Sequence, residues 1–246
     1  MADNLHWTEE YTRITRKIFG NPLPTDFRAQ KINSCYPADS EWFEKAFAAL
    51  YAIELEYVDN LLLDLKSRNV PGAFAEFGVF QGAWINRLHE MTERAGLGDR
   101  QIWGFDSFSG LSRPHPSADI SFWKEGMYAV PRSQVESNVH AAKRPRLHLV
   151  EGFFSESLTR PDAGALGEVA FARIDCDLYE PALDCLKYQG PRLSSGSILI
   201  FDDWTHHQEF GETRAFLEWL PSVPQLRFEF LILGPWDHCY LRVWHR

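Results

Sequence analysis

The stretch VAFARIDCDLYEP (residues 169–181) is the most informative part of the chain, because an apolar run ends there in two carboxylates, Asp175 and Asp177. A second apolar run, GSILIFDDWTHH (residues 196–207), ends in the adjacent pair Asp202–Asp203. Short apolar runs bounded by turns or helix starts predict buried strands. Crowded ionised carboxylates repel one another, so four of them at strand ends normally have a cation as partner. We therefore expect the chemistry of this protein at these two strand ends.

Strand-like and helix-like segments alternate around these two runs. The alternation predicts an α/β doubly wound fold with a seven-stranded sheet that is closed by a C-terminal β-hairpin. In such folds ligands bind at the carboxyl ends of the parallel strands, which is where the aspartates fall. We expect strands at residues 73–79, 101–108, 146–153, 169–175, 197–201, 227–234 and 239–246, and helices at 83–95, near 180–189 and at 211–220.

Two segments fall outside the alternation. Residues 1–70 predict an N-terminal helical extension, in which apolar side chains recur at helical spacing from Ser40 to about Lys66. This helix could pack into the core, or form an oligomer contact or a wall of the pocket, beside a main domain at residues 71–246. The second segment, residues 109–131, has no clear period. Irregular loops of that length inside a compact domain are usually functional, so we expect a lid over the active site.

Composition narrows the class of protein. The net charge of -9, with no run rich in lysine or arginine, argues against a nucleic-acid-binding surface. No stretch approaches the ~18 apolar residues of a membrane span, and the N-terminus has no apolar signal-peptide region. The four cysteines are scattered without metal-binding spacing, as reduced thiols are. We expect a cytoplasmic enzyme with neither nucleic acid nor membrane as partner.

The segment EFGVFQG (residues 76–82) follows the first expected strand. Glycines at that point let a ligand approach the backbone, and the next helix offers free N–H groups. Phe80 stands where the dinucleotide motif has its second glycine, so the segment better fits a cofactor without phosphates. Asp106 ends the second strand, where a carboxylate can accept hydrogen bonds from ribose hydroxyls. Together they indicate an adenosine-containing ligand; the alternatives are a tight turn and a turn-capping aspartate.

The four aspartates suit a hard cation. Asp175 and Asp177 project from one face if the strand continues, and Asp202–Asp203 can converge only if the chain turns after Phe201. Three or four carboxylates without cysteine or histidine fit Mg²⁺, with Ca²⁺ or Mn²⁺ possible. The alternative is that some of the aspartates cap helices. His206 could act beside the cluster as a ligand or a proton shuttle, or be an exposed loop histidine.

Several motifs in this order and spacing carry a resemblance: EFGVFQG, FDSFSGL, GMYAV…VESNV, EGFFSESL, RIDCDLYEP and FDDW. Together they resemble the macrocin O-methyltransferase family, whose members use S-adenosylmethionine and Mg²⁺ to methylate hydroxyls of natural products. The resemblance covers about residues 70–245, whereas residues 1–70 match the family poorly. In this family such an extension is where acceptor-binding and dimer-forming elements are expected. It implies a class I methyltransferase (Rossmann-like) fold and a small hydroxylated acceptor such as a sugar or phenol, in antibiotic biosynthesis, with a homodimer as the expected assembly.

The resemblance also implies site residues. Asp175, Asp202 and Asp203 would be the metal ligands, and Asp177 the general base, a role that His206 could take instead. The S-adenosylmethionine site would be formed by Glu76, Gly78, Val79, Gly82, Asp106, Ser107, Gly152, Phe153 and Asp175.

Two other classes of protein share features with this chain. Asp-x-Asp with a later Asp-Asp occurs in haloacid-dehalogenase-like phosphotransferases, where the first aspartate is a nucleophile on an early strand. Here the motif comes far down the chain, and Tyr179 stands where those enzymes have Thr or Val. A non-catalytic nucleoside-binding module would share the fold, but it would not need the acidic cluster.

Overall fold

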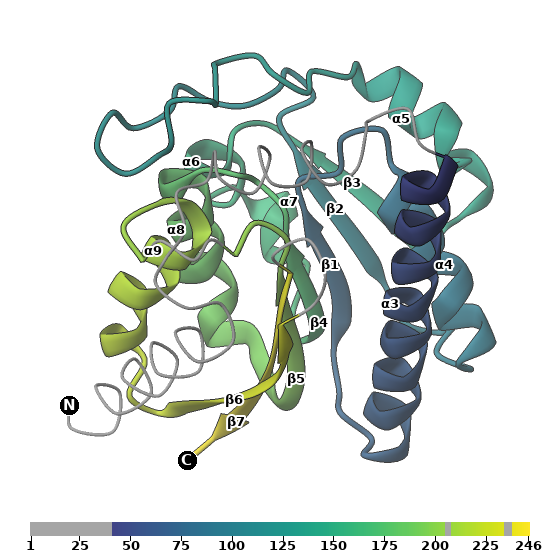
Figure 1. Ribbon diagram of the computed structural model, residues 1–246. Helices are drawn as coiled ribbons and strands as arrows, with labels where there is room; N and C mark the ends of the chain where they lie inside the picture. Colours follow the sequence, from purple (N-terminus) through teal and green to yellow (C-terminus); the bar gives the residue numbers. More distant parts are fainter. Residues whose placement is uncertain (1–40, 205–207, 234–237) are drawn as a thin grey trace. The chain divides into compact units, whose positions relative to one another are not determined.

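The computed structural model describes residues 41–204, 208–233 and 238–246 (Figure 1). The chain forms two compact units, Met1–Asn60 and Leu61–Arg246. What we expected of residues 1–40, of His206 and of His207 lies outside the described residues. Helix α3 (Glu41–Ser67) agrees with the helix expected from the spacing of apolar residues. Within the described residues, no helix has the length and apolar character that a membrane crossing requires.

The larger unit contains a seven-stranded sheet in the order β3-β2-β1-β4-β5-β7-β6 (Figure 1). Neighbouring strands from β3 to β5 pair in parallel, and β7 is antiparallel to both β5 and β6. The expected α/β fold with seven strands is therefore confirmed. The strands are β1 (Ala73–Phe77), β2 (Ile102–Asp106), β3 (Leu147–Glu151), β4 (Val169–Ile174), β5 (Leu193–Phe201), β6 (Leu226–Leu233) and β7 (Cys239–His245).

The C-terminal strands differ in one respect from an added hairpin. β6 and β7 pair antiparallel as expected, but β7 lies between β5 and β6. The last strand of the sequence is thus an inner strand, and its residues are buried from Cys239 to Val243. β5 starts at Leu193, four residues before the expected start at Ser197, and this early part is irregular: Gly196 has φ of 91°, and the register with β4 shifts between Val169 and Phe171.

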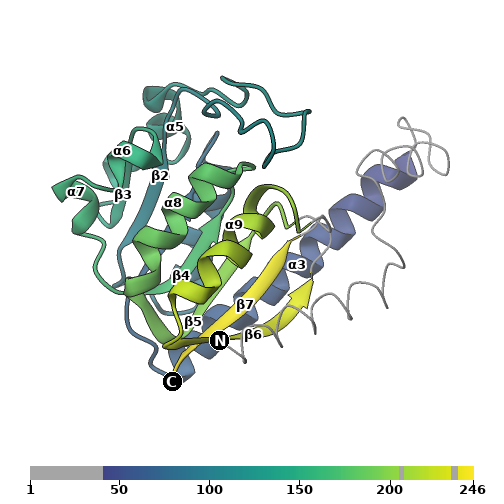
Figure 2. The same cartoon turned by 90° about the vertical axis from the view of Figure 1, so that its left-hand side faces the viewer.

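Helices cover both faces of the sheet. On one face, Trp84 of α4 stacks on Phe171 of β4 with ring centroids 5.8 Å apart. On the other, Tyr188 of α8 packs against Phe77 and Phe105, and α8 and α9 lie side by side (Figure 2). The helices of this unit are α4 (Ala83–Arg94), α5 (Arg132–Asn138), α6 (Phe154–Ser157), α7 (Pro161–Gly164), α8 (Tyr179–Gln189) and α9 (Gly211–Trp219), with 3-10 turns η1 (Ala141–Lys143), η2 (Gly190–Arg192) and η3 (Leu220–Ser222).

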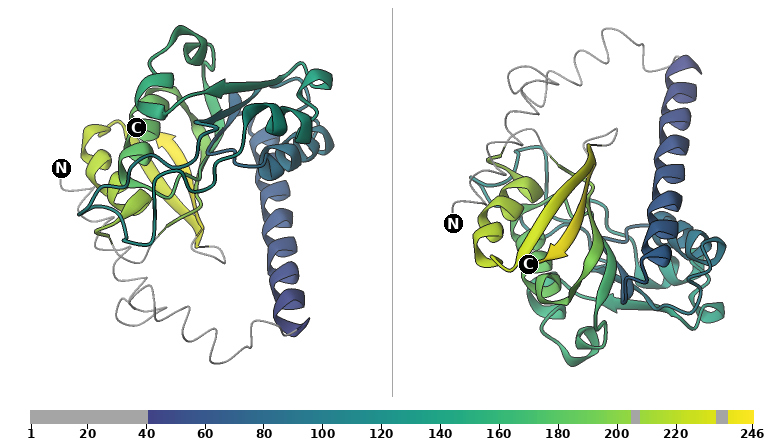
Figure 3. Two further views of the ribbon diagram at one scale, coloured as in Figure 1. Left: turned by 90° about the horizontal axis from the view of Figure 1, so that it is seen from above. Right: turned by 90° about the horizontal axis from the view of Figure 1, so that it is seen from below.

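Residues 109–131 lie between β2 and α5 and have no regular secondary structure, as the sequence predicts. This segment, which we call the β2–α5 loop, is drawn in teal at the upper end of the sheet in Figure 1 and is seen from above in Figure 3. Its base is closed by backbone hydrogen bonds, from Leu111 N–H to the Met127 carbonyl and from Gly126 N–H to the Leu111 carbonyl. The loop therefore leaves and rejoins the domain at one point, near the carboxyl ends of the strands.

Candidate functional site

A cavity of about 550 Å³ opens at the carboxyl ends of the parallel strands. Its walls come from the turns after β1, β2, β3, β4 and β5, together with the β2–α5 loop and the start of α8. This is the edge at which open α/β sheets bind ligands. Its lining residues are Gly78, Phe80, Asp106, Ser107, Gly110, Leu111, Ser112, Arg113, Trp123, Tyr128, Phe153, Phe154, Ser155, Glu156, Asp175, Cys176, Asp177, Glu180, Pro181, Asp184, Asp202 and Asp203.

Three of the four aspartates converge as the sequence predicts. One ligand atom from each of Asp175, Asp202 and Asp203 lies within 4.8 Å of the others. The chain leaves β5 at Phe201, and Asp202 N–H donates to the Ile174 carbonyl over 2.9 Å, which brings the two strand ends together. A donor set of carboxylate oxygens at this separation fits a hard divalent cation such as Mg²⁺.

Asp177 reaches the cluster by a different route from the one expected. β4 ends at Ile174, so Asp175 and Asp177 do not share a strand face, and the same-face expectation is wrong. Asp177 instead has a left-handed backbone with φ of 62°, which turns the chain into α8. Its carboxyl group still forms a hydrogen bond with that of Asp203. The turn, rather than the strand, therefore brings Asp177 to the cluster.

Burial and mutual repulsion change how these carboxyl groups hold protons. Burial, followed by the charge of Asp175, raises the pKa of Asp177 to about 8. Burial raises the pKa of Asp175 to about 7, against the opposing effect of Arg173. Burial also raises the pKa of Asp203 well above its usual range, and the charge of Asp177 adds to the effect. Asp202 differs, because Arg173 and His238 outweigh its burial and lower its pKa. Without a cation, the cluster therefore holds protons near neutral pH.

A buried arginine that sequence reasoning did not identify lies behind the cluster. Arg173 of β4 contacts Asp175 Oδ2 over 2.6 Å and Asp202 Oδ1 over 2.5 Å. It also contacts Glu76 Oε1 over 2.9 Å. A signal was present, because Glu76 and Arg173 each interrupt an apolar strand run, and buried charges need partners. The register of β1 and β4 pairs these two positions directly.

Two more residues at the site were also missed. Glu212, at the start of α9, accepts hydrogen bonds from Cys176 N–H over 2.9 Å and from Asp203 N–H over 3.1 Å, so it joins the two acidic turns. His238 Nε2 lies 3.0 Å from Asp202 Oδ1. His238 comes from the residue before β7, which the antiparallel pairing places beside the end of β5. Neither residue lies in a recognisable sequence motif. Both reach the site only because α9 and β7 lie beside the end of β5.

The turn after β1 is shaped by close backbone approaches. Gly78 has φ of 95°, and a Cβ there would lie 1.7 Å from the Asp175 carbonyl oxygen. Gly82, at the start of α4, has φ of 84°, and a Cβ there would lie 2.4 Å from Val139. Glycine is required at both positions, since other residues are strained at such φ values. At Gly78 the turn after β1 therefore lies directly against the backbone of Asp175. This contact joins the expected cofactor side of the cavity, around the glycine turn, to the acidic side, around the four aspartates.

Asp106 sits at the end of β2 and its carboxylate is held by backbone donors. Oδ2 accepts from Val79 N–H over 2.7 Å and from Phe80 N–H over 2.9 Å, while Oδ1 accepts from Phe108 N–H over 2.7 Å. The turn-capping role that we set beside ribose binding is therefore present. Two carboxylate oxygens offer about four acceptor positions, so capacity for a ligand hydroxyl remains. The position of Asp106 in the cavity wall is compatible with both roles.

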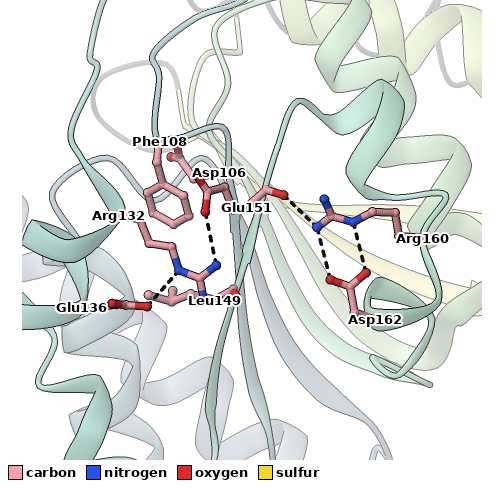
Figure 4. A network of polar contacts seen from close by, with 8 residues as sticks. All are labelled: Asp106, Phe108, Arg132, Glu136, Leu149, Glu151, Arg160 and Asp162. Atoms are coloured by element: carbon pink, nitrogen blue, oxygen red, sulfur yellow. Dashed lines mark hydrogen bonds and ion pairs between the residues drawn. The ribbon is translucent and has the colours of Figure 1, made fainter.

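Glu151 ends β3 next to Asp106, and two arginines flank it (Figure 4). Arg132 Nη1 lies 3.3 Å from Glu151 Oε2, and Arg160 Nη2 donates to the Glu151 carbonyl over 2.7 Å. Gly152 follows with φ of 130°, and then Phe153, which lines the cavity. The two arginines thus fix the strand end from which the expected cofactor wall continues.

The β2–α5 loop is anchored to the acidic side of the cavity by Asp119. This buried carboxylate accepts from Tyr179 N–H over 2.7 Å, at the first turn of α8, and from His115 N–H over 2.7 Å. Gly211 N–H donates to the Ala118 carbonyl, which ties the loop to α9 as well. Asp119 therefore caps the helix that follows Asp177, a role that we had considered for the clustered aspartates.

Beyond this anchor the loop presents aromatic rings to the cavity. Tyr128 packs edge-on against Phe80 with centroids 5.5 Å apart, and Trp123 lies 6.1 Å from Tyr128. Phe80 and Tyr128 are nonetheless exposed, at 42% and 45% of their surface. Exposed rings that line a cavity offer contact area to a ring-shaped ligand.

Comparison with known proteins agrees with this geometry. The Macrocin-O-methyltransferase (TylF) family model matches residues 27–218. The chain belongs to this family. The match starts at residue 27, so our expectation that residues 1–70 match the family poorly needs correction: the similarity takes in much of the N-terminal extension.

Among curated relatives, the chain is 32% identical over 165 residues to the 8-demethyl-8-(2,3-dimethoxy-alpha-L-rhamnosyl)-tetracenomycin-C 4'-O-methyltransferase of Streptomyces olivaceus. That alignment covers 62% of this chain and 61% of the relative. The chain spans about three-fifths of the length of the curated relatives it matches.

Two solved structures support the fold. The O-methyltransferase NovP is 23% identical, with a TM-score of 0.63 over 78% of this chain and 79% of that chain. The calicheamicin methyltransferase CalS11 is 26% identical, with a TM-score of 0.59 over 95% and 91%. The expected class I methyltransferase fold is therefore confirmed.

The cavity brings together most of the expected site residues. It is lined by Gly78, Asp106, Ser107 and Phe153 on the cofactor side and by all four aspartates on the other. Glu76 is 1% exposed and faces Arg173, whereas Val79, Gly82 and Gly152 lie in the adjoining turns. The roles of these residues remain predictions.

Proposed function

We propose that this chain is an O-methyltransferase that uses S-adenosylmethionine and Mg²⁺ and methylates a hydroxyl group of a natural product. One observation carries the proposal: an all-oxygen acidic cluster shares a cavity with the glycine turn and Asp106 of a class I methyltransferase fold. Membership of the macrocin O-methyltransferase family supports it. The phosphotransferase alternative is disfavoured, because Asp175 follows β4 and not an early strand.

Three aspartates, Asp175, Asp202 and Asp203, would hold the metal. When bound, a divalent cation would supply the charge that lowers the pKa of a nearby hydroxyl, and S-adenosylmethionine would supply a methyl group on a sulfonium. Asp177 would accept the hydroxyl proton at a carboxylate oxygen. His206, the other candidate base, lies outside the described residues.

The remaining residues would orient the reactants and exclude water. Asp106 and the turn from Gly78 would hold the nucleoside, which fixes the direction from which the methyl group approaches. The aromatic rings of the β2–α5 loop would cover the acceptor, and their shape would select it. The acceptor we favour is a deoxysugar, free as a nucleotide derivative or attached to a larger natural product. CalS11 is described in its apo form as a TDP-rhamnose 3'-O-methyltransferase, and the relative from Streptomyces olivaceus carries a rhamnosyl substrate in its name.

Calorimetry provides the first test. We expect S-adenosylhomocysteine to bind the purified protein, and Mn²⁺ or Mg²⁺ to bind at a single site that Asp203→Asn removes. The second test is transfer of a labelled methyl group from S-adenosylmethionine to TDP-rhamnose, with and without EDTA. Absence of S-adenosylhomocysteine binding would refute the proposal. Transfer that is unchanged in EDTA would refute the metal requirement alone.

We also propose, as expectations from family membership, that the protein acts in antibiotic biosynthesis, is cytoplasmic and forms a homodimer through the N-terminal extension. Sedimentation of the purified chain, compared with a chain that starts at residue 61, tests the dimer. A monomer at micromolar concentration would contradict it.

A further inference from the structure

Arg173 is placed where three neighbouring strands end in carboxylates. Glu76 belongs to β1, Asp175 follows β4 and Asp202 follows β5, and the strand register sets Arg173 opposite Glu76 and Ile200. The guanidinium lies 5.0 Å from the centre of the Trp84 ring, so its plane is supported by α4. A planar guanidinium with fixed donors can bridge several carboxylates at once, which a lysine ammonium does less well.

The contacts of Arg173 divide the oxygens of each metal-ligand candidate. Arg173 engages Oδ2 of Asp175 and Oδ1 of Asp202. His238 Nε2 approaches the same Oδ1 of Asp202 from the β7 side. Each carboxylate thus has a second oxygen that these contacts do not use. Residues that hydrogen-bond to metal ligands commonly orient those ligands in this way, and mutating such residues lowers metal affinity about 10–100-fold.

We propose that Arg173 is a positioning residue for the metal site. By holding one oxygen of Asp175 and one of Asp202, it turns the other oxygen of each toward the cation. The proposal rests on the metal-dependent function proposed above and adds a specific residue to it.

A simpler role for Arg173 makes the opposite prediction. If the guanidinium only neutralised the aspartates until a metal arrived, it would repel the incoming cation, and its removal would tighten metal binding. If it positions the ligands, its removal weakens metal binding although a repelling charge is lost. The sign of the change in metal affinity therefore separates the two roles.

The experiment measures Mn²⁺ affinity by calorimetry and by the electron paramagnetic resonance signal of free Mn²⁺, for wild type, Arg173→Gln and Arg173→Lys. We expect at least a tenfold loss of Mn²⁺ affinity in both variants, because neither side chain bridges the three carboxylates. S-adenosylhomocysteine affinity, measured in EDTA, should stay within twofold of wild type. Arg68→Gln is the matched control, since Arg68 is an exposed arginine paired with Asp64, and it should change neither affinity.

Other outcomes overturn the proposal. Tighter Mn²⁺ binding in Arg173→Gln would assign the neutralising role instead, and unchanged binding would rule out both roles. A parallel loss of Mn²⁺ and S-adenosylhomocysteine binding, with a large fall in melting temperature, would show that Arg173 only supports the fold. Wild-type protein that binds no Mn²⁺ would overturn this proposal together with the metal-dependent function, whereas normal Mn²⁺ binding by both variants would overturn this proposal alone.

A crystal structure of the wild-type protein with Mn²⁺ keeps the proposal testable if the variants fail to fold. Arg173 should retain its contacts with Asp175 and Asp202 while the metal is bound to their other oxygens. An Arg173 side chain that has moved away from both carboxylates would overturn the proposal.

Discussion

Both sides of the cavity contain aspartates at or just after the end of a strand, but the surroundings of these aspartates differ. On the cofactor side, Asp106 accepts hydrogen bonds from three backbone N–H groups. On the acidic side, Asp177 and Asp203 share a hydrogen bond with each other, and burial raises the pKa of both. A carboxylate that already accepts backbone hydrogen bonds suits a neutral, hydroxyl-bearing ligand, whereas a crowd of carboxylates suits a cation. The groups that surround each aspartate, and not the residue type alone, therefore indicate which ligand it binds.

The largest expected effect is on the acidic side. Asp202→Ala removes a candidate metal ligand, and we expect Mn²⁺ affinity to fall more than about 100-fold, beyond the range typical of groups behind ligands. Metal-dependent methyl transfer should be lost with it. Calorimetry measures the affinity, and S-adenosylhomocysteine binding in EDTA is the control, which should be unchanged. Full methyl transfer by this variant, or by wild type in EDTA, would remove the contrast between the two sides.

The reverse change tests the cofactor side. Asp106→Ala removes a charged acceptor and leaves three backbone donors without their partner. We therefore expect S-adenosylhomocysteine affinity to fall about 10–100-fold, the equivalent of losing one hydrogen bond to a charged group. Mn²⁺ affinity should not change. Asp106→Asn, which keeps one oxygen acceptor, is the matched variant and should lose less. Equal losses of cofactor and metal affinity would argue that Asp106 acts by holding the fold.

Protonation gives a third, smaller contrast. The folded pKa of Asp177, about 8, lies above the ordinary value of 3.8, so the metal-free folded protein binds an extra proton between these pH values. Stability contributed by that proton is present at low pH and is lost as pH rises toward 8. Asp177→Asn cannot ionise, so we expect it to be more stable than wild type at pH 8 by about 1–3 kcal/mol, and by much less at pH 4. Thermal melts in EDTA across this range measure the difference; a constant difference at all pH values would contradict the assignment.

The smallest expected effect concerns the anchor of the β2–α5 loop. Asp119→Ala removes the acceptor for Tyr179 N–H at the start of α8, which should cost about 1 kcal/mol, as for other helix caps. The loosened loop should raise the KM for the acceptor, while S-adenosylhomocysteine affinity stays unchanged. Asp119→Asn keeps one oxygen for Tyr179 N–H but loses the one that accepts from His115 N–H, so it should lie between wild type and Asp119→Ala. An unaltered KM would indicate that the loop does not cover the acceptor.

The sequence predicts the fold well because its signals are local. Apolar runs, glycine turns and helical spacing identified the seven strands, and the end of β5 at Phe201 explains why Asp202 and Asp203 converge. The path of Asp177 was not predictable, because a left-handed residue other than glycine leaves no compositional mark.

The contacts that support the cluster escaped prediction for a related reason, although Glu76 itself was among the expected site residues. Arg173 and Glu76 are 97 residues apart in sequence. Only the order of the strands shows that these two side chains meet. His238 and Glu212 reach the site from the residue before β7 and from the start of α9, and nothing in their own segments distinguishes them. Local patterns thus locate the candidate ligands, whereas the groups that orient them follow from topology.

The place of β7 in the sheet has a consequence for how the protein is made. β5, which leads into Asp202 and Asp203, is paired on one side by β4, but its other neighbour is β7, Cys239–His245. A ribosome that has finished β5 must still add α9, β6 and β7 before this second pairing can form. During that interval β5 is an open edge, available for pairing with other chains. We expect newly made chains that stop before β7 to be captured by chaperones, and the acidic site to be completed only after β7 has joined the sheet.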